Sequence, residues 1–206
     1  MAALSTAFSF GMELYIIEDY KNIELGTVGA DMETAESVPT EEGSGRTSPG
    51  SRLTNALVKE LLISNSHVSE EEWKRNRMRI LRQPGGKPVL EPNRGICFSV
   101  SHTGDVFACV IAEMEETSSV GLDIQQSRNM DVQKLALRFY TEEENQWLNS
   151  NPEGFFRLWT RKEAYAKYTG TGLVSVLEKT SVLGRTDVIF EDLDLGNGLY
   201  GCICRE

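Results

Sequence analysis

The sequence lacks any long hydrophobic run. None of its apolar stretches approaches the roughly eighteen residues of a membrane-spanning helix. Residues 1–8 also lack the basic start that is typical of a secretory signal. These absences argue against a membrane protein, and we expect a cytoplasmic location.

Cysteine is scarce, and its spacing is not that of a metal site. The four cysteines show no CxxC pair, and the single Cys-x-Cys near residue 203 does not by itself indicate zinc. We therefore expect reduced thiols, with Cys202 and Cys204 on one face of a final strand.

Basic residues are outnumbered. Twenty-one lysines and arginines face 31 acidic residues, which gives a net charge of −10. Because binding to nucleic acid requires a basic surface that neutralises phosphates, this balance argues against a general nucleic-acid-binding protein.

What the sequence does contain is typical of a globular protein. Its 206 residues, 40% hydrophobic and 25% charged, suffice for a sizeable core in one domain or two small ones. Hydrophobic periodicity and turn residues predict strands and helices in an order that favours an α+β architecture, with helices against mostly antiparallel sheets. Strands are expected at 12–17, 77–81, 96–100, 105–112, 119–124, 180–190 and 198–205, helices at 51–62, 68–73, 132–139, 141–148 and 154–168, and a loop at 31–51.

The most informative motif lies in the predicted helix 154–168. It reads Trp-x-x-Lys-Glu-Ala-x-x-Lys, and it places Glu163 and Lys167 four residues apart on one helix face. Taken alone, this pair could be a surface ion pair worth only about 0.3–0.5 kcal/mol. Upstream, however, Asp123 ends a short apolar strand, which adds a second, firmly held carboxylate.

Two shorter motifs precede Asp123. Ser101 and His102 follow the predicted strand 96–100, and Lys87 stands in a Gly-Lys-Pro triplet. In isolation, His102 would be interpreted as a capping or turn residue and the triplet as a turn.

Taken together, these motifs resemble those of the 4′-phosphopantetheinyl transferases, specifically their larger type, which serves peptide and polyketide synthases. The resemblance is specific between residues 86 and 173. It implies two similar α+β halves, a pseudo-dimer in one chain with the active site between them. We place the division near residue 115, giving halves at 1–115 and 116–206.

The resemblance also implies a reaction and its residues. The expected function is Mg²⁺-dependent transfer of 4′-phosphopantetheine from coenzyme A to a serine of an acyl or peptidyl carrier protein, which converts the apo form to the holo form. Asp123, Glu163 and Gln125 would hold the metal, Glu163 would activate the serine, and Lys167 would handle phosphate charge. The residues expected to bind coenzyme A are Lys87, Ser101, His102, Arg46 and Arg52.

This chain departs from the family pattern at Gln125, where the larger enzymes commonly carry an acid. One alternative that stays open is therefore a non-catalytic module that binds coenzyme A or a carrier protein. A second is a hydrolase that uses the same acids on a phosphate diester. Carrier proteins are usually acidic, so a basic docking patch would have to be local, and the candidates are Arg157, Arg161, Lys162 and Lys134. The resemblance further implies a monomer, and no nucleic-acid or membrane partner is expected.

Overall fold

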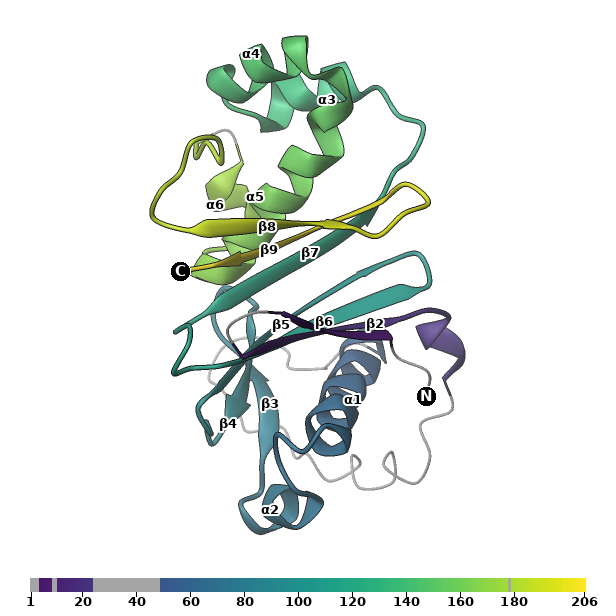
Figure 1. Ribbon diagram of the computed structural model, residues 1–206, viewed down its shortest axis with the longest axis vertical. Coiled ribbons are helices and arrows are strands. Elements are labelled where there is room, and N and C mark those ends of the chain that lie inside the picture. The colour runs from purple at the N-terminus through teal and green to yellow at the C-terminus, as the bar shows by residue number, and fades with distance from the viewer. Residues whose placement is uncertain (1–3, 9–10, 24–48, 178) are drawn as a thin grey trace.

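The computed structural model describes residues 4–8, 11–23, 49–177 and 179–206. These residues form two α+β units, each built on an antiparallel sheet, and the two sheets face each other across the middle of the molecule (Figure 1). The helices lie on the outer sides, with α1 (Pro49–Ser64) beneath the first sheet and α5 (Phe155–Thr169) above the second. The predicted α+β class is confirmed.

The first unit has a four-stranded sheet in the order β1-β2-β6-β5. A two-stranded hairpin and the short helix α2 (Glu70–Arg75) extend from it. The sheet strands are β1 (Leu4–Phe8), β2 (Met12–Ile17), β5 (Ile96–Thr103) and β6 (Val106–Glu113), the hairpin is β3 (Arg79–Arg82) with β4 (Pro88–Glu91), and a 3-10 turn, η1, covers Tyr20–Asn22.

The second unit has a three-stranded sheet in the order β7-β9-β8. Helix α5 packs across it, and the shorter helices α3 and α4 lie beyond α5 (Figure 1). The remaining elements are β7 (Val120–Gln126), α3 (Val132–Phe139), α4 (Glu142–Ser150), η3 (Pro152–Gly154), α6 (Leu173–Val176), β8 (Ile189–Asp194) and β9 (Leu199–Arg205).

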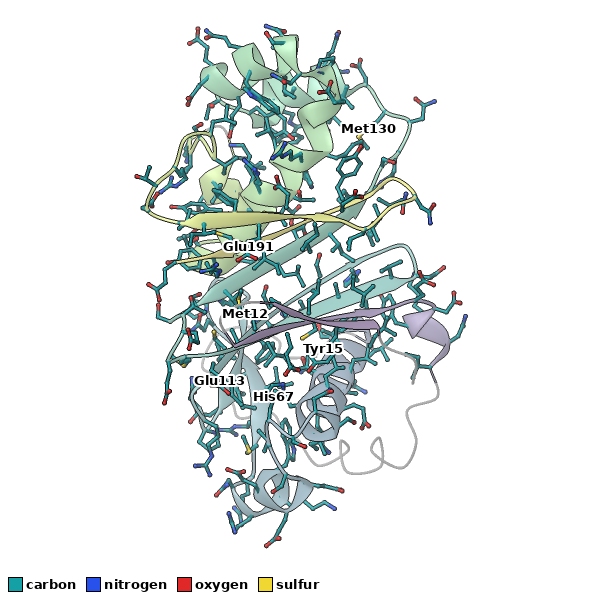
Figure 2. The ribbon with its side chains drawn as sticks, viewed as in Figure 1. Met12, Tyr15, His67, Glu113, Met130 and Glu191 are labelled. Carbon is teal, nitrogen blue, oxygen red and sulfur yellow. The ribbon has the colours of Figure 1, made fainter. Side chains whose placement is uncertain are left out.

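Strand alternation explains how the first sheet serves two cores. Along β2, Tyr15 packs in the core beneath the sheet, beside α1, whereas Met12 packs in the core between the two sheets (Figure 2). Along β6, Phe107 and Ile111 likewise belong to the α1 core, and Val110 belongs to the core between the sheets. Successive side chains point to opposite faces of a strand, so a continuous apolar strand can bury both of its faces.

A row of hydroxyl groups joins the two sheets. The side chains of Ser99, Ser101 and Thr103, alternate residues of β5, each accept a hydrogen bond from a backbone N–H of β7. The N···O distances to Leu122, Ile124 and Gln126 are 2.9, 3.2 and 3.2 Å. This hydroxyl ladder satisfies N–H groups on the edge of β7 that does not pair with β9, so the two units are joined without a continuous sheet.

Helix α5 approaches β7 so closely that only glycine fits at residue 121. A Cβ atom built there would lie 2.0 Å from the carbonyl oxygen of Ala164 and 2.5 Å from the backbone nitrogen of Tyr168. Backbone atoms cannot move aside as a side chain can. The close approach brings the helix face that carries Glu163 toward the strand that carries Asp123.

We expect Gly121→Ala to lower the free energy of unfolding by about 1–3 kcal/mol or more, because β7 and α5 must separate to accommodate the methyl group. Urea denaturation measures this loss. Gly201→Ala in β9 is the matched control, since the three atoms nearest to its added Cβ belong to side chains, the first being Leu193 Cδ1 at 3.1 Å. A loss no greater for Gly121→Ala than for Gly201→Ala would contradict the close packing.

Three elements differ from the sequence-based prediction. The strand expected at 180–190 begins only at Ile189, because the backbone groups of Thr180 and Val182 bind the buried side chains of Lys162 and Glu144 instead of a neighbouring strand. Strand β4 was not predicted, since the segment from Gln83 to Pro88 indicated only a turn. In addition, α1 begins at Pro49, inside the loop expected at 31–51, whose first eighteen residues lie outside the described part.

The division predicted near residue 115 stays a prediction. The chain passes from the first sheet to the second between Glu113, the last residue of β6, and Val120, the first residue of β7. Within the described residues, no helix combines the length and the apolar character that crossing a membrane requires.

Candidate active site

Asp123 lies near the middle of β7, on the face opposite Leu122 and Ile124. Those two neighbours lie in the core between the sheets, and Asp123 itself is only 4% exposed. Its Oδ1 atom accepts hydrogen bonds from Ser101 Oγ and Lys167 Nζ, each at 2.8 Å. The other oxygen, Oδ2, is buried and has no hydrogen-bond partner among the described residues. A buried carboxylate oxygen without a partner is costly, so this atom marks a place where a cation or donor would be stabilised.

Glu163 faces the same region from α5. Burial, and to a smaller extent the nearby charge of Asp123, raises the pKa of its carboxyl from 4.5 to about 7, against the opposing effects of Lys167 and a side-chain hydrogen bond to Trp159. The structure therefore brings together Asp123, Glu163 and Lys167, as the sequence predicted. With two carboxylates and one ammonium, the cluster carries excess negative charge when all three groups are ionised.

In the absence of divalent metal, stability should fall as the pH rises from about 4.5 to about 7. The pKa of Glu163 is higher in the folded protein than its ordinary value, so the folded protein binds this proton more tightly than the unfolded chain does. The contribution is complete below pH 4.5 and is lost as the pH rises through 7.

The measurement compares urea denaturation of the wild type and Glu163→Gln at pH 5 and pH 8 in the presence of EDTA. We expect the wild type to lose roughly 1–3 kcal/mol more than the variant over this range. Glu143→Gln, an exposed position on α4, should follow the wild type. Parallel losses in the wild type and Glu163→Gln would mean that Glu163 ionises normally.

The donor set fits a hard divalent cation. Magnesium prefers carboxylate and amide oxygens and usually keeps several of its waters, so two carboxylates can suffice to hold it. A positive charge between the two acids would give the Oδ2 atom of Asp123 a partner, and it would lower the raised pKa of Glu163. The described residues contain no group of three or more His, Cys, Asp or Glu side chains arranged to hold a metal. A site here therefore depends on two acids, with Gln125 two residues beyond Asp123 on β7.

A pocket of about 250 Å³ opens beside these acids. Both units contribute to its walls, and its charged side chains are Arg82, Lys87, Glu163 and Lys167. Three of these four are basic, so the pocket suits an anionic ligand although the chain as a whole is acidic. Arg82, at the end of β3, was not predicted as a site residue, because a single arginine in an exposed strand carries no motif.

Lys87 lines this pocket, and its ammonium group is hydrogen-bonded within the protein. Its ammonium group donates to the hydroxyl of Ser119 and to the carbonyl oxygens of Val120 and Tyr168, the latter two at 3.1 and 3.2 Å. Burial lowers the pKa of Lys87. The side chain thus joins the β3–β4 turn to the start of β7 and the end of α5, and its contact with coenzyme A stays a prediction.

Ser101 and His102 are adjacent on β5 and point to opposite faces. While Ser101 binds Asp123, the ring of His102 packs near Tyr20, with ring centroids 6.0 Å apart. Burial lowers the pKa of His102, and the positive charges of Lys167 and Lys21 lower it further. Lys21, which also forms an ion pair with Asp105 at 2.9 Å, was missed because no recognisable motif surrounds it.

The other two predicted coenzyme ligands lie away from this cluster or beyond the described residues. Arg52 is exposed on α1 and is not among the residues that line the pocket. Arg46 lies outside the described residues. Their roles stay predictions.

The expected local basic patch was partly wrong. Lys162 is fully buried, and both Arg157 and Arg161 bind the carboxylate of Asp192 at distances of 2.5–2.8 Å. Their positive charge is therefore partly offset by this acid of β8. The lysine was misjudged because a charged residue in a helix is usually exposed.

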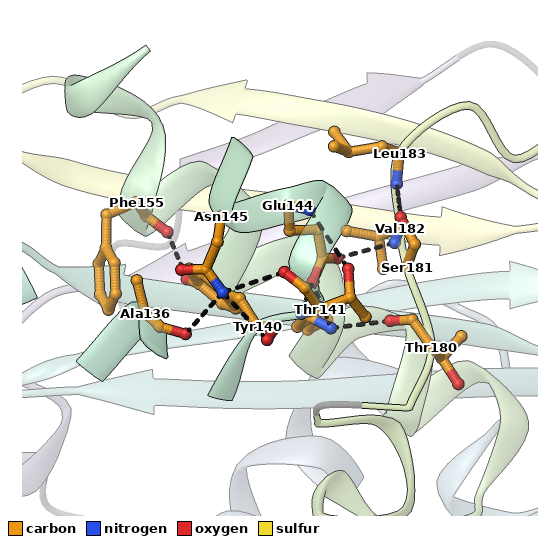
Figure 3. Close-up of polar contacts among 11 residues, drawn as sticks. Ala136, Tyr140, Thr141, Glu144, Asn145, Phe155, Thr180, Ser181, Val182 and Leu183 are labelled. Atoms are coloured by element: carbon orange, nitrogen blue, oxygen red, sulfur yellow. Dashed lines mark hydrogen bonds and ion pairs between the residues drawn. The ribbon is translucent and has the colours of Figure 1, made fainter. Parts of the chain in front are cut away.

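Lys162 instead forms a buried ion pair that holds the helices of the second unit together. Its Nζ atom lies 2.8 Å from Glu144 Oε2, and both side chains are 0% exposed. The carboxylate of Glu144 also accepts the backbone N–H groups of Thr141 and Val182, and Lys162 donates to the carbonyl oxygen of Thr180 (Figure 3). The ion pair thus fixes α5 at the residue before Glu163.

A second hollow, which we call the apolar groove, has a volume of about 150 Å³, and Gln125 lines it. The Gln125 amide donates to the carbonyl oxygen of Gln126 at 3.0 Å. The groove is next to the acids, since Gln125 is two residues from Asp123 and Trp159 is one helical turn from Glu163. It is lined by Gln125, Arg128, Met130, Leu135, Phe139, Phe155, Phe156 and Trp159.

The segment that carries this cluster is similar in sequence to known proteins. Residues 119–193 match the model of the 4′-phosphopantetheinyl transferase superfamily, and this segment includes Asp123, Glu163 and Lys167. The 4′-phosphopantetheinyl transferase HetI of Nostoc is 34% identical over 111 residues, which are 50% of this chain and 46% of that protein.

Two further relatives match a similar share. The 4′-phosphopantetheinyl transferase gsp of Aneurinibacillus migulanus is 32% identical over 123 residues, covering 57% of this chain and 49% of the relative. For Sfp of Bacillus subtilis the identity is 24% over 131 residues, covering 61% and 56%. The chain thus spans about half the length of the curated relatives it matches. In its motifs, its α+β fold and these matches, the chain is similar to the 4′-phosphopantetheinyl transferases, and the superfamily model itself matches residues 119–193.

Proposed function

We propose that this protein transfers the 4′-phosphopantetheine group of coenzyme A to a serine of an acyl or peptidyl carrier protein, in a Mg²⁺-dependent reaction. The observation that carries the proposal is the cluster of Asp123, Glu163 and Lys167 beside a basic pocket, within the segment that matches the superfamily. Such a pocket suits the phosphates of coenzyme A, and paired carboxylates suit the metal and the proton transfer that the reaction needs.

Asp123, through its unpartnered Oδ2 atom, and Glu163 would hold the cation, with Gln125 as a neutral oxygen donor nearby. When bound, Mg²⁺ supplies charge neutralisation at the diphosphate of coenzyme A. Glu163 then accepts the proton of the carrier serine as the serine oxygen forms a bond to the phosphorus of the phosphopantetheine group. The P–O bond to 3′,5′-ADP breaks, and the leaving nucleotide takes the electron pair.

Lys167 is placed to handle the charge of the leaving phosphate. Two of its three N–H groups bind Asp123 Oδ1 and the carbonyl oxygen of Leu122, each at 2.8 Å. The third can donate to a phosphate oxygen, because the side chain lines the pocket. Without the contact to Asp123, the ammonium group of Lys167 would lose both its fixed position and its acidic partner.

The coenzyme would enter through the basic pocket. Lys87 and Arg82 place positive charge in the walls. At the end of β5, Lys21 adds positive charge close to His102, whose neutral ring can still donate one N–H. We propose that these residues hold the phosphates at the nucleotide end, with Arg46 and Arg52 as further contacts. The apolar groove would receive an apolar surface of the carrier protein, next to the reacting serine.

The family resemblance favours a monomer that acts in the cytoplasm on carrier proteins of polyketide or nonribosomal peptide synthesis. Release of 3′,5′-ADP distinguishes the proposed activity from its alternatives. The protein is incubated with coenzyme A and Mg²⁺, with and without an apo carrier protein, and the nucleotide is measured by chromatography. A transferase releases 3′,5′-ADP only when the carrier is present. Release without a carrier would indicate a hydrolase, and coenzyme A binding without any release would indicate a binding module.

A further inference from the structure

The hydroxyl ladder on β5 has one member that differs from the other two. Ser99 and Thr103 accept a backbone N–H of β7, whereas Ser101 accepts the N–H of Ile124 and also donates its own proton to Asp123 Oδ1 at 2.8 Å. A serine hydroxyl has one proton to donate. The only donor of Ser101 is therefore committed to the carboxylate, inside a side chain that is 6% exposed.

This bond acts on the orientation of Asp123. Ser101 and Lys167 approach the carboxylate as donors, from two different elements, and both bind the same oxygen, Oδ1. With Oδ1 held twice, the carboxylate cannot rotate to exchange its two oxygens without breaking two hydrogen bonds. The result is a buried Oδ2 atom with no partner in the described part of the chain.

We propose that Ser101 is a positioning residue that acts through Asp123 and keeps the Oδ2 atom turned toward the cation. The inference rests on the proposed function, since it concerns the metal of that reaction. It gives Ser101 a different task from the coenzyme contact that the family motif predicts. Donors behind a metal ligand fix its orientation, and their removal typically weakens metal affinity by about 10–100-fold.

The test is the affinity for Mn²⁺, measured by electron paramagnetic resonance with the full chain and coenzyme A present. Ser101→Ala removes the donor to Asp123 and also the ladder hydrogen bond from the backbone N–H of Ile124. Thr103→Val removes the neighbouring ladder hydrogen bond, which Gln126 N donates at 3.2 Å. It leaves the contacts of Asp123 unchanged, so it is the matched control. Ser101→Cys is the second variant, because its thiol has a similar size and is only a weak donor.

We expect Ser101→Ala and Ser101→Cys to bind Mn²⁺ at least about tenfold more weakly than the wild type. Thr103→Val should stay within about twofold of the wild type, although its urea midpoint falls as that of Ser101→Ala does. Should Ser101→Ala fail to fold, Ser101→Cys supplies the comparison. Equal affinities in the Ser101 variants and the wild type would overturn the positioning role alone. A wild type that binds no Mn²⁺ would overturn the proposed metal site, and the positioning role with it.

Discussion

Glu163→Gln should lower the rate of phosphopantetheine transfer by about 10²–10⁴-fold while the protein stays folded. The amide cannot accept the proton of the carrier serine, and general-base catalysis contributes a factor of this size. It is also a weaker ligand for a cation than the carboxylate. Because Glu163 is a buried acid whose pKa is raised to about 7, its replacement removes an unfavourable charge above that pH, and the variant should unfold no more easily than the wild type.

The measurement is the initial rate of carrier modification at pH 8 with saturating coenzyme A and Mg²⁺. The control is Glu143→Gln, whose exposed carboxylate lies on the same unit, and its rate should stay within about twofold of the wild type. Equal rates for Glu163→Gln and the wild type would show that another group takes the serine proton. Reduced activity in both variants would point to a general loss of negative charge instead.

The second large effect is on stability. We expect Lys162→Met to reduce the free energy of unfolding by about 3–5 kcal/mol, because it leaves the carboxylate of Glu144 buried without its ammonium partner. Both side chains of this pair are 0% exposed, and their atoms are 2.8 Å apart. The variant also leaves the carbonyl oxygen of Thr180 without the donor that it now has from Lys162. Urea denaturation of the wild type and the variant gives the difference.

Two further variants test whether the charge itself is responsible. Lys74→Met removes a lysine from an ion pair with Glu70 of similar length, 2.9 Å, whose side chains are 60% and 62% exposed, and it should cost less than about 1 kcal/mol. Combining Lys162→Met with Glu144→Gln removes the orphaned charge, so the double variant should recover part of the loss. A double variant less stable than Lys162→Met alone would contradict this explanation.

The sequence was sufficient to predict which acids meet. Asp123 was expected at the end of an apolar strand and lies near the middle of β7. Glu163 shares a helix face with Lys167, so the two periodicities still determine which side each residue presents. The structure brings Lys167 to 2.8 Å from Asp123, and both groups affect the pKa of Glu163. These placements follow from local pattern together with a family motif that specifies the pairing.

The partners of these residues were harder to predict, because they come from distant segments. In sequence, Ser99, Ser101 and Thr103 look like the polar face of a half-buried strand, and nothing indicates that they bind the edge of β7. Lys162 looked like a surface residue because its partner, Glu144, lies eighteen residues earlier in another helix. The same ion pair draws the backbone of Thr180 and Val182 away from the strand that the apolar pattern predicted there.

The most direct test of the proposed transfer is the intact mass of a carrier protein. An apo acyl or peptidyl carrier protein is incubated with coenzyme A, Mg²⁺ and this protein, beside the same carrier with its acceptor serine replaced by alanine. We predict a gain of one phosphopantetheine on the first carrier and none on the second. No gain on several apo carriers, while coenzyme A binding is measurable, would contradict the proposed transferase activity.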